Sequence, residues 1–567
     1  MKTFLYSILL LLLSLSLTAQ NTTLIITGKN KQETQIIDSI SYIKKHDSPE
    51  AAKIESRKII KTLSKSGYLN LNSSFLTTKK QDTLLFHVEL NQKIQEAHLY
   101  IDKNKINTSP FLKELKNDTL IIPFTEIENF LNKKYEILET SGKPFSKLRL
   151  INLQQKQNIL IAELDFYIEN KRTIDAIVFN YEDEKKTTQL PEGFQKFLLK
   201  KYKGKDYNKK TIEEIKNEIN QIDFIKQNKY PEVLFKKDST IVYTYLSKNN
   251  SNTFDGYIGF NNDENQKIKP SGYLNLKLDN ILYHGEQFKL LWNNNGGQQK
   301  SFNSSLEIPF LFKTPISLKG ELNIFTQDSI FQNTKTEIGI GYLLNLNSKI
   351  SFYYTNTESS NTQNGISDIN NLADFKTKFA SLGFRFQKKS TQTFFSRKNQ
   401  LLELILGYGT RNASTLTPQK QIQINTEYRN TFELNTKNHI YLRNYNFLLT
   451  SNHYLTNELF RFGGMNSIRG FIENNLQANY TSYLNTSYIY QLSPKIAVNS
   501  VIDFGIFQDK TNKTNLNKLN TIKSFGIEFN LETGNNNLLL SLVNGTIEDE
   551  KTNLYNTILT ICYNVKF

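Results

Sequence analysis

Residues 555–567 read YNTILTICYNVKF, and their spacing decides the fold of the C-terminal half of the chain. The apolar side chains Leu559, Ile561, Tyr563, Val565 and Phe567 occupy every second position. Successive side chains of a β-strand point to opposite faces. Apolar residues at every second position therefore predict a strand with one apolar face. The opposite face is mixed and carries asparagine, threonine, cysteine and lysine.

The same alternation recurs throughout residues 253–567, for example over Ile422–Tyr428 and Phe525–Leu531. We count 16 such segments, centred near residues 258, 277, 290, 304, 321, 340, 353, 381, 405, 427, 444, 483, 502, 526, 542 and 561. A tilted membrane strand needs about 9–11 residues, and closed antiparallel barrels have an even number of strands. The predicted fold of this region is an all-β, 16-stranded antiparallel transmembrane barrel. A soluble β-solenoid or β-sandwich is the alternative. Neither of these folds needs an apolar, lipid-facing side on so many strands.

The composition excludes several other classes of protein. The chain has 567 residues, a net charge of +16 and a mean hydropathy of −0.48, which does not suit a bundle of apolar membrane helices. Aromatic residues make up 12%, which is too many for a disordered chain. The basic excess is spread over both halves of the chain, so it does not predict nucleic-acid binding. This positive charge is instead consistent with a protein surface that lies beside anionic lipids.

The N-terminus resembles an export signal. Lys2 precedes the apolar run Phe4–Leu17, and Ala19 follows as a small residue. This order is typical of a secretory signal peptide, which we place at residues 1–19, with an uncleaved anchor as the alternative. Cys562 is the single cysteine, so no intramolecular disulfide is expected.

Residues 20–252 alternate helical and strand patterns and predict three α+β units of the order β-α-α-β-β, at 20–92, 93–171 and 172–252. In the first unit the helices are expected at 32–44 and 49–66. Pro49 near the start of the second helix and Gly67 after its end suit those positions. The middle unit is the least regular and keeps one long helical pattern at 124–141.

The segment Leu459–Phe471, LFRFGGMNSIRGF, falls between the eleventh and twelfth predicted strands, in the sixth outer loop. It resembles the sixth-loop motif of the BamA/TamA superfamily of outer-membrane assembly and translocation barrels. The matching residues are Gly463, Gly464, Ile468, Arg469, Gly470 and Phe471. The α+β units resemble the periplasmic POTRA domains of that family, and Asp503-Phe504-Gly505 resembles its D-x-G motif. Three units resemble TamA more than BamA, which usually has five.

The resemblance implies that the sixth loop folds into the barrel. A buried arginine is costly unless a carboxylate meets it, and the planar guanidinium suits such a partner. Asp503 shares the lumen-facing side of its strand with Asn499, so we expect Arg469 to meet Asp503, with Glu528 as a second partner and Gly505 beside them. The family often has a further carboxylate on the twelfth strand, but residues 475–492 contain none.

The first and last strands are expected to form a weak lateral seam. The first strand is predicted at Phe254–Asn261 and is short, and Gly256 and Gly259 weaken it. Tyr563 and Phe567 lie on the last strand, across the seam. The resemblance implies that a client strand adds to this edge. The alternative is that both glycines only relieve crowding where the barrel curves.

The sequence carries no enzyme motif, and its six histidines lack metal-ligand spacing, so we expect no enzyme, cofactor or metal site. The resemblance implies an outer-membrane protein with periplasmic N-terminal domains that inserts or translocates unfolded polypeptides. Its expected partners are outer-membrane or secreted polypeptide clients, periplasmic or inner-membrane proteins that bind the POTRA-like units, and outer-membrane lipid, but no nucleic acid. A dedicated secretion pore, a lipid or lipopolysaccharide export barrel and a passive porin-like channel remain alternatives.

Overall fold

The computed structural model describes residues 22–77, 82–102, 118–182, 189–262, 268–294, 299–327, 330–362, 371–389, 400–414, 416–512, 518–534, 536–548 and 556–567. The predicted signal peptide at 1–19 lies outside these ranges. The chain forms two compact units, one of Met1–Thr173 with Asp206–Lys210 and the other of Ile174–Lys205 with Thr211–Phe567. Within the described ranges, no helix has both the length and the apolar character needed to cross a membrane.

The first unit begins with a four-stranded sheet of order β2-β1-β4-β3, in which β1 and β4 run parallel. Its elements are β1 (Thr22–Gly28), α2 (Lys31–Ser39), β2 (Lys45–His46), α3 (Pro49–Lys65), β3 (Asn72–Leu76) and β4 (Thr83–Glu89). Ser48 caps α3, and Pro49 occupies its first turn as the sequence predicts. Leu24, Ile37 and Leu63 are fully buried in the core between the sheet and the helices.

A second sheet of the same unit has the order β6-β5-β8-β7, again with its two central strands parallel. Its elements are β5 (Glu96–Tyr100), β6 (Thr119–Pro123), the short η3 (Phe124–Glu126), α5 (Ile127–Thr140), β7 (Lys147–Lys156) and β8 (Ile159–Tyr167). Ala97, Leu99, Leu160 and Ala162 form its buried core.

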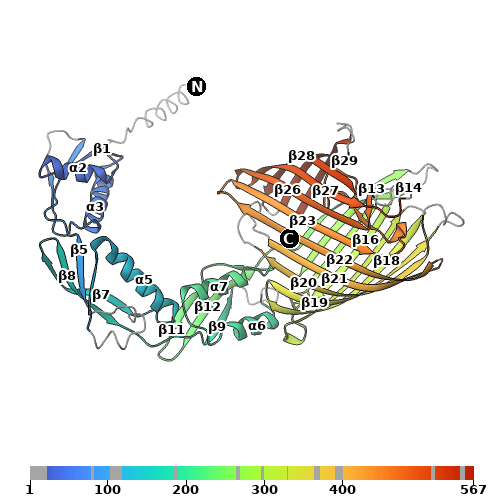
Figure 1. Cartoon of the computed structure of the whole chain (residues 1–567), viewed down its shortest axis with the longest axis horizontal. Helices are drawn as coiled ribbons and strands as arrows, with labels where there is room; N and C mark the ends of the chain where they lie inside the picture. Colours follow the sequence, from blue (N-terminus) through green and yellow to red (C-terminus); the bar gives the residue numbers. More distant parts are fainter. Residues whose placement is uncertain are drawn as a thin grey trace, which may run out of the picture. The chain divides into compact units, whose positions relative to one another are not determined.

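The second unit opens with a third α+β domain, whose strand β12 pairs with β9, β10 and β11. Its elements are β9 (Ala176–Tyr181), α6 (Glu192–Tyr202), α7 (Lys209–Ile219), β10 (Ile225–Gln227), β11 (Glu232–Phe235) and β12 (Thr240–Lys248). Together with the two sheets of the first unit, this domain confirms the predicted α+β fold class (Figure 1).

Two details of the α+β region differ from the sequence prediction. The helix expected at 32–44 ends at Ser39, because Ser41 has a left-handed φ of 49° and Lys45–His46 pair with the edge of β1 instead. The strands β6 and β10 were not predicted. Each is short, with five and three residues, and each is fixed by pairing with a neighbouring strand rather than by its own pattern.

The barrel is closed and has 16 antiparallel strands, which confirms the predicted fold class (Figure 1). All 16 predicted centres fall inside a strand. The strands are β13 (Thr253–Asn262), β14 (Ile268–Asp279), β15 (Gln287–Asn294), β16 (Gln299–Ile308), β17 (Ile316–Gln327), β18 (Phe331–Asn345), β19 (Ser348–Asn361), β20 (Phe375–Lys388), β21 (Gln400–Ala413), β22 (Leu416–Glu433), β23 (Asn438–Thr450), β26 (Tyr480–Ser493), β27 (Ile496–Gln508), β28 (Asn520–Thr533), β29 (Asn536–Ile547) and β30 (Ile558–Lys566).

The two faces of the barrel wall differ as the period of two requires. On β27, Ile502 is 61% exposed on the outer face, whereas the neighbouring Asp503 is 2% exposed and faces the lumen. Large apolar side chains such as Ile338, Leu382 and Ile561 are exposed on other strands in the same way. An apolar outer face with a polar interior is typical of a barrel that sits in lipid.

Candidate functional site

The connection between β23 and β26 folds back as a small hairpin of β24 (Phe460–Phe462) and β25 (Leu476–Ala478). Two consecutive glycines open its turn, Gly463 with φ 112° and Gly464 with φ 95°. Side chains other than glycine rarely adopt these backbone angles. The Gly463 amide donates to the Ser467 hydroxyl at 2.7 Å, and the Gly464 amide donates to the Ile468 carbonyl at 3.1 Å. The turn therefore presents Ile468 and Arg469 at the tip of the loop.

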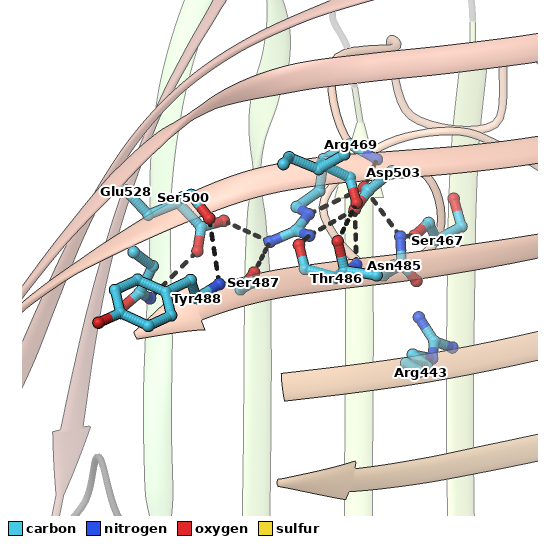
Figure 2. A network of polar contacts seen from close by, with 12 residues as sticks. Arg443, Ser467, Arg469, Asn485, Thr486, Ser487, Tyr488, Ser500, Asp503 and Glu528 are labelled. Atoms are coloured by element: carbon cyan, nitrogen blue, oxygen red, sulfur yellow. Dashed lines mark hydrogen bonds and ion pairs between the residues drawn. The ribbon is translucent and has the colours of Figure 1, made fainter. Parts of the chain in front are cut away.

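Arg469 lies at the centre of a buried polar network (Figure 2). Its Nε donates to Asp503 Oδ2 at 2.9 Å, and its Nη2 donates to Asp503 Oδ1. Its Nη1 donates to Glu528 Oε1 at 3.2 Å and to Ser487 Oγ at 3.0 Å. Nη2 also reaches the Thr486 carbonyl at 3.0 Å. We call Arg469, Asp503 and Glu528 the arginine lock.

The carboxylates of the arginine lock have further donors. Asn485 Nδ2 donates to Asp503 Oδ2 at 2.8 Å, and the backbone amide of Arg469 donates to the same oxygen at 3.1 Å. Buried charges are tolerated when paired and hydrogen-bonded in this way. The carboxylate that the twelfth strand lacks is replaced by neutral acceptors on β26, the Ser487 hydroxyl and the Thr486 carbonyl.

The apolar residues and the glycines of the motif allow the loop tip to pack closely against the inner wall of the barrel. Ile468 is fully buried in an apolar cluster with Phe462 and Tyr483, and Phe471 packs at its edge. Gly470 has φ 81°, and a Cβ there would lie 2.7 Å from the Gly545 amide nitrogen on β29. A Cβ on Gly505 would lie 2.8 Å from the Cβ of Tyr483. Glycine is required at both positions by close approach.

Further contacts of the loop tip were not predicted from the sequence. Gly545 faces Gly470, Asn485 donates to the Ser467 carbonyl at 2.9 Å, and Arg443 Nη1 donates to the Asn466 carbonyl at 2.6 Å. Arg443 also donates to Glu427 at 2.8 Å, which fixes its position on β23. The alternation of polar and apolar residues predicts which side of each strand faces the lumen. It does not predict which strand the loop contacts, because that depends on the path of the loop inside the lumen.

The seam between β13 and β30 is paired over only a short stretch. In the described residues of both strands, two pairs are in register, Thr253 with Lys566 and Phe254 with Val565. The Phe567 amide adds one bond, to the Asn252 carbonyl at 3.0 Å. On its other side β30 pairs with β29 from Val543 to Asn536.

The first strand, β13, has ten residues, one more at each end than predicted, and it pairs with β14 along its whole length. By contrast, the described residues of β13 pair with β30 at only two positions. A Cβ on Gly256 would lie 2.6 Å from the Tyr273 carbonyl oxygen, so this glycine permits close approach of β14. Gly259 lies opposite Ser271 in the same pair of strands. Tyr563 and Phe567 are about half exposed on the outer face.

The third α+β domain contacts the barrel through Asp223. Its carboxylate forms ion pairs with Lys389 at 2.6 Å and with Lys277 at 3.0 Å. The rings of Phe194 on α6 and Phe310 lie 4.5 Å apart beside this ion pair. Burial opposes the charge of Asp223, but the two lysines outweigh it and lower its pKa to about 2.

We expect acid to weaken this junction. Because the folded pKa of Asp223 lies below its ordinary value of 3.8, its contribution to stability is complete above that value and is lost as the pH falls towards 2. The effect should be on the order of 2 kcal/mol. Hydrogen exchange of peptides covering 219–228, corrected for intrinsic rates, should show reduced protection between pH 4 and 2. Asp223→Asn should remove this pH dependence, and an unchanged profile in that variant would contradict the assignment.

In the described residues, no group of three histidine, cysteine, aspartate or glutamate side chains could hold a metal ion.

The fold and the site define a class of protein: 16-stranded barrels with N-terminal α+β domains and a sixth loop held inside the lumen. No protein-family model and no curated protein matches the sequence. Among solved structures, CdiB from Escherichia coli has a TM-score of 0.51 at 11% identity, covering 95% of this chain and 97% of that one. The predicted resemblance is thereby confirmed for the fold.

Two further structures resemble this chain less closely in three dimensions. CdiB from Acinetobacter baumannii has a TM-score of 0.49 at 13% identity, covering 84% of this chain and 90% of that one. BamA from Haemophilus ducreyi lacking POTRA domains 1–3 has a TM-score of 0.46 at 14% identity, covering 83% and 99%.

Proposed function

We propose that this protein inserts or translocates unfolded polypeptides at the outer membrane, with its α+β domains in the periplasm. The observation that carries the proposal is the short seam, where β13 and β30 share two pairs in register while β13 and β14 share ten. Among the residues that the structure describes, the backbone donors and acceptors of β13 beyond Phe254 have no strand partner on that side. Such an edge is a template for the strand of a client polypeptide.

The arginine lock supports this proposal because it holds the wall next to the seam. Arg469 contacts β26, β27 and β28, and Gly470 contacts β29, so the loop tip ties together four of the strands that precede β30. We infer that these strands stay together while the seam opens. The α+β domains would receive clients and periplasmic or inner-membrane partner proteins, and outer-membrane lipid would surround the barrel.

A dedicated polypeptide secretion pore is the second candidate. A cavity of about 460 Å³ lies beside the sixth loop in the lumen, lined by Phe460, Arg461 and Glu458 among others. A client that crosses the lumen would pass this cavity, whereas a client inserted at the seam would not need it. Lipid or lipopolysaccharide export and passive solute conduction are the remaining alternatives, and neither requires a client strand.

Depletion of the protein followed by quantitative outer-membrane proteomics tests the proposal. We expect the barrel proteins of the outer membrane to fall together, because all of them would need the same seam for insertion. Periplasmic chaperone substrates should accumulate at the same time. Loss of one exported protein alone would favour the secretion pore, and altered lipopolysaccharide with unchanged barrel proteins would contradict the proposal.

A further inference from the structure

A second set of contacts holds the beginning of the sixth loop, at residues 455–458. Glu458 forms an ion pair with Arg411 on β21 and accepts from Gln421 Nε2 on β22 at 2.9 Å. The next residue upstream, Asn457, donates to Ser359 Oγ on β19 at 2.7 Å, and its carbonyl accepts from Asn333 on β18 at 2.7 Å. We call Arg411 and Glu458 the outer latch.

The outer latch lies at the end of the barrel far from the third α+β domain. The chain enters β13 directly from that domain, and strands alternate in direction, so β21 ends at the far rim. Arg411 is two residues from the end of β21, and Gln421 is near the start of β22. Leu455 packs at the same rim in an apolar cluster with Ala373 and Phe375. Glu458 and Asn457 thus fix the beginning of the loop to β18, β19, β21 and β22, whereas the arginine lock fixes its tip to β26–β28.

The two ion pairs differ in how completely their donors are used. In the arginine lock, Nε, Nη1 and Nη2 of Arg469 all donate to acceptors. In the outer latch, Arg411 is 0% exposed, yet among the described residues its Nε and Nη2 have no acceptor, and Nη1 alone meets Glu458. Unpaired buried donors are costly, and a buried ion pair with incomplete hydrogen bonding is weak. The outer latch is therefore the weaker of the two attachments.

We propose that the outer latch opens before the arginine lock, so that residues 455–458 leave the β18–β22 wall while the loop tip stays on Asp503. Arg411 and Glu458 are then positioning residues that keep the outer end of the lumen covered. This inference rests on the proposed function for its orientation in the membrane. It adds an outer gate whose opening is separate from that of the seam.

Conductance of the purified full-length protein in planar bilayers tests the first half of this inference. We expect Glu458→Gln to raise the frequency of open events about tenfold, since the buried guanidinium loses its partner charge. Gln421→Ala removes one hydrogen bond and should raise it less, which provides a milder variant if Glu458→Gln folds poorly. Glu358→Gln is the matched control, because Glu358 pairs with Lys376 at the same rim but is exposed. Equal conductance of Glu458→Gln, Gln421→Ala and the control would overturn the inference.

Distances between spin labels test the order of opening, in a Cys562→Ser background. Labels at His453 and Thr417 report on the outer latch, and labels at Asn466 and Tyr488 report on the loop tip. In Glu458→Gln we expect the first distance distribution to broaden while the second is unchanged. Simultaneous broadening of both would contradict the proposed order. Neither measurement contains a client, so these results stand apart from the depletion experiment that tests the proposed function.

Discussion

We expect Arg469→Ala to lower the free energy of unfolding of the barrel by about 3–5 kcal/mol, the cost of leaving buried charges without their partner. Asp503 is 2% exposed and Glu528 is 7% exposed, and both would lose the guanidinium that lies between them. Asp503 would keep its hydrogen bond from Asn485, so the loss should be large without being complete. The urea midpoint of the purified protein in lipid vesicles, followed by its heat-modifiable band on gels, measures the change.

Arg429→Ala is the matched control for this prediction. Arg429 also faces a lumenal carboxylate, Glu427, but Glu427 keeps a second partner in Arg443 at 2.8 Å. We expect a loss well below that of Arg469→Ala. Arg469→Lys should fall between the two, because lysine keeps the charge but lacks the planar fork that meets Asp503 at two oxygens. If Arg469→Ala and Arg429→Ala have the same midpoint, the arginine lock does not stabilise the barrel.

The barrel was predictable from the sequence because lipid and lumen impose opposite demands on alternate residues. Every strand centre inferred from that alternation falls within a strand, including the last strand, β30. The inward side of Asp503 could be predicted for the same reason. The short strands β6 and β10 could not be predicted, because three to five residues carry too little periodicity and tertiary pairing decides them.

The site was only partly predictable. The motif around Arg469 and the lumenal carboxylates Asp503 and Glu528 could be found one strand at a time. The contact between Arg469 and these carboxylates depends on the path of the loop, which the local sequence pattern does not encode. The ion pair of Arg411 with Glu458 was not predicted for the same reason. The weak seam was expected from a short first strand with two glycines. The strand β13 has ten residues, and among the described residues its pairing with β30 covers two register pairs.

We expect a disulfide across the seam to abolish the insertion of clients. Phe254 and Val565 are paired in register, and the Cβ atoms of such cross-strand neighbours lie about 4.5–5.5 Å apart, near disulfide range. The pair Phe254→Cys and Val565→Cys, made in a Cys562→Ser background, would join the edges of β13 and β30. A client strand could then no longer enter between them.

The control uses the same cysteine on β30. Val565 is also paired in register with Asn536 on β29, so Asn536→Cys with Val565→Cys places a disulfide one strand away from the seam. This bond joins strands that we expect to stay together, and insertion should continue. Oxidation of each pair is verified by the shift of the denatured band on non-reducing gels.

The central claim is tested most directly by the amount of newly made barrel protein that reaches the outer membrane in cells whose single copy of this protein carries one of these disulfides. We predict that insertion stops with the 254–565 disulfide, continues with the 536–565 disulfide and returns when the first is reduced. Full insertion in cells where the 254–565 disulfide has formed completely would contradict the lateral seam.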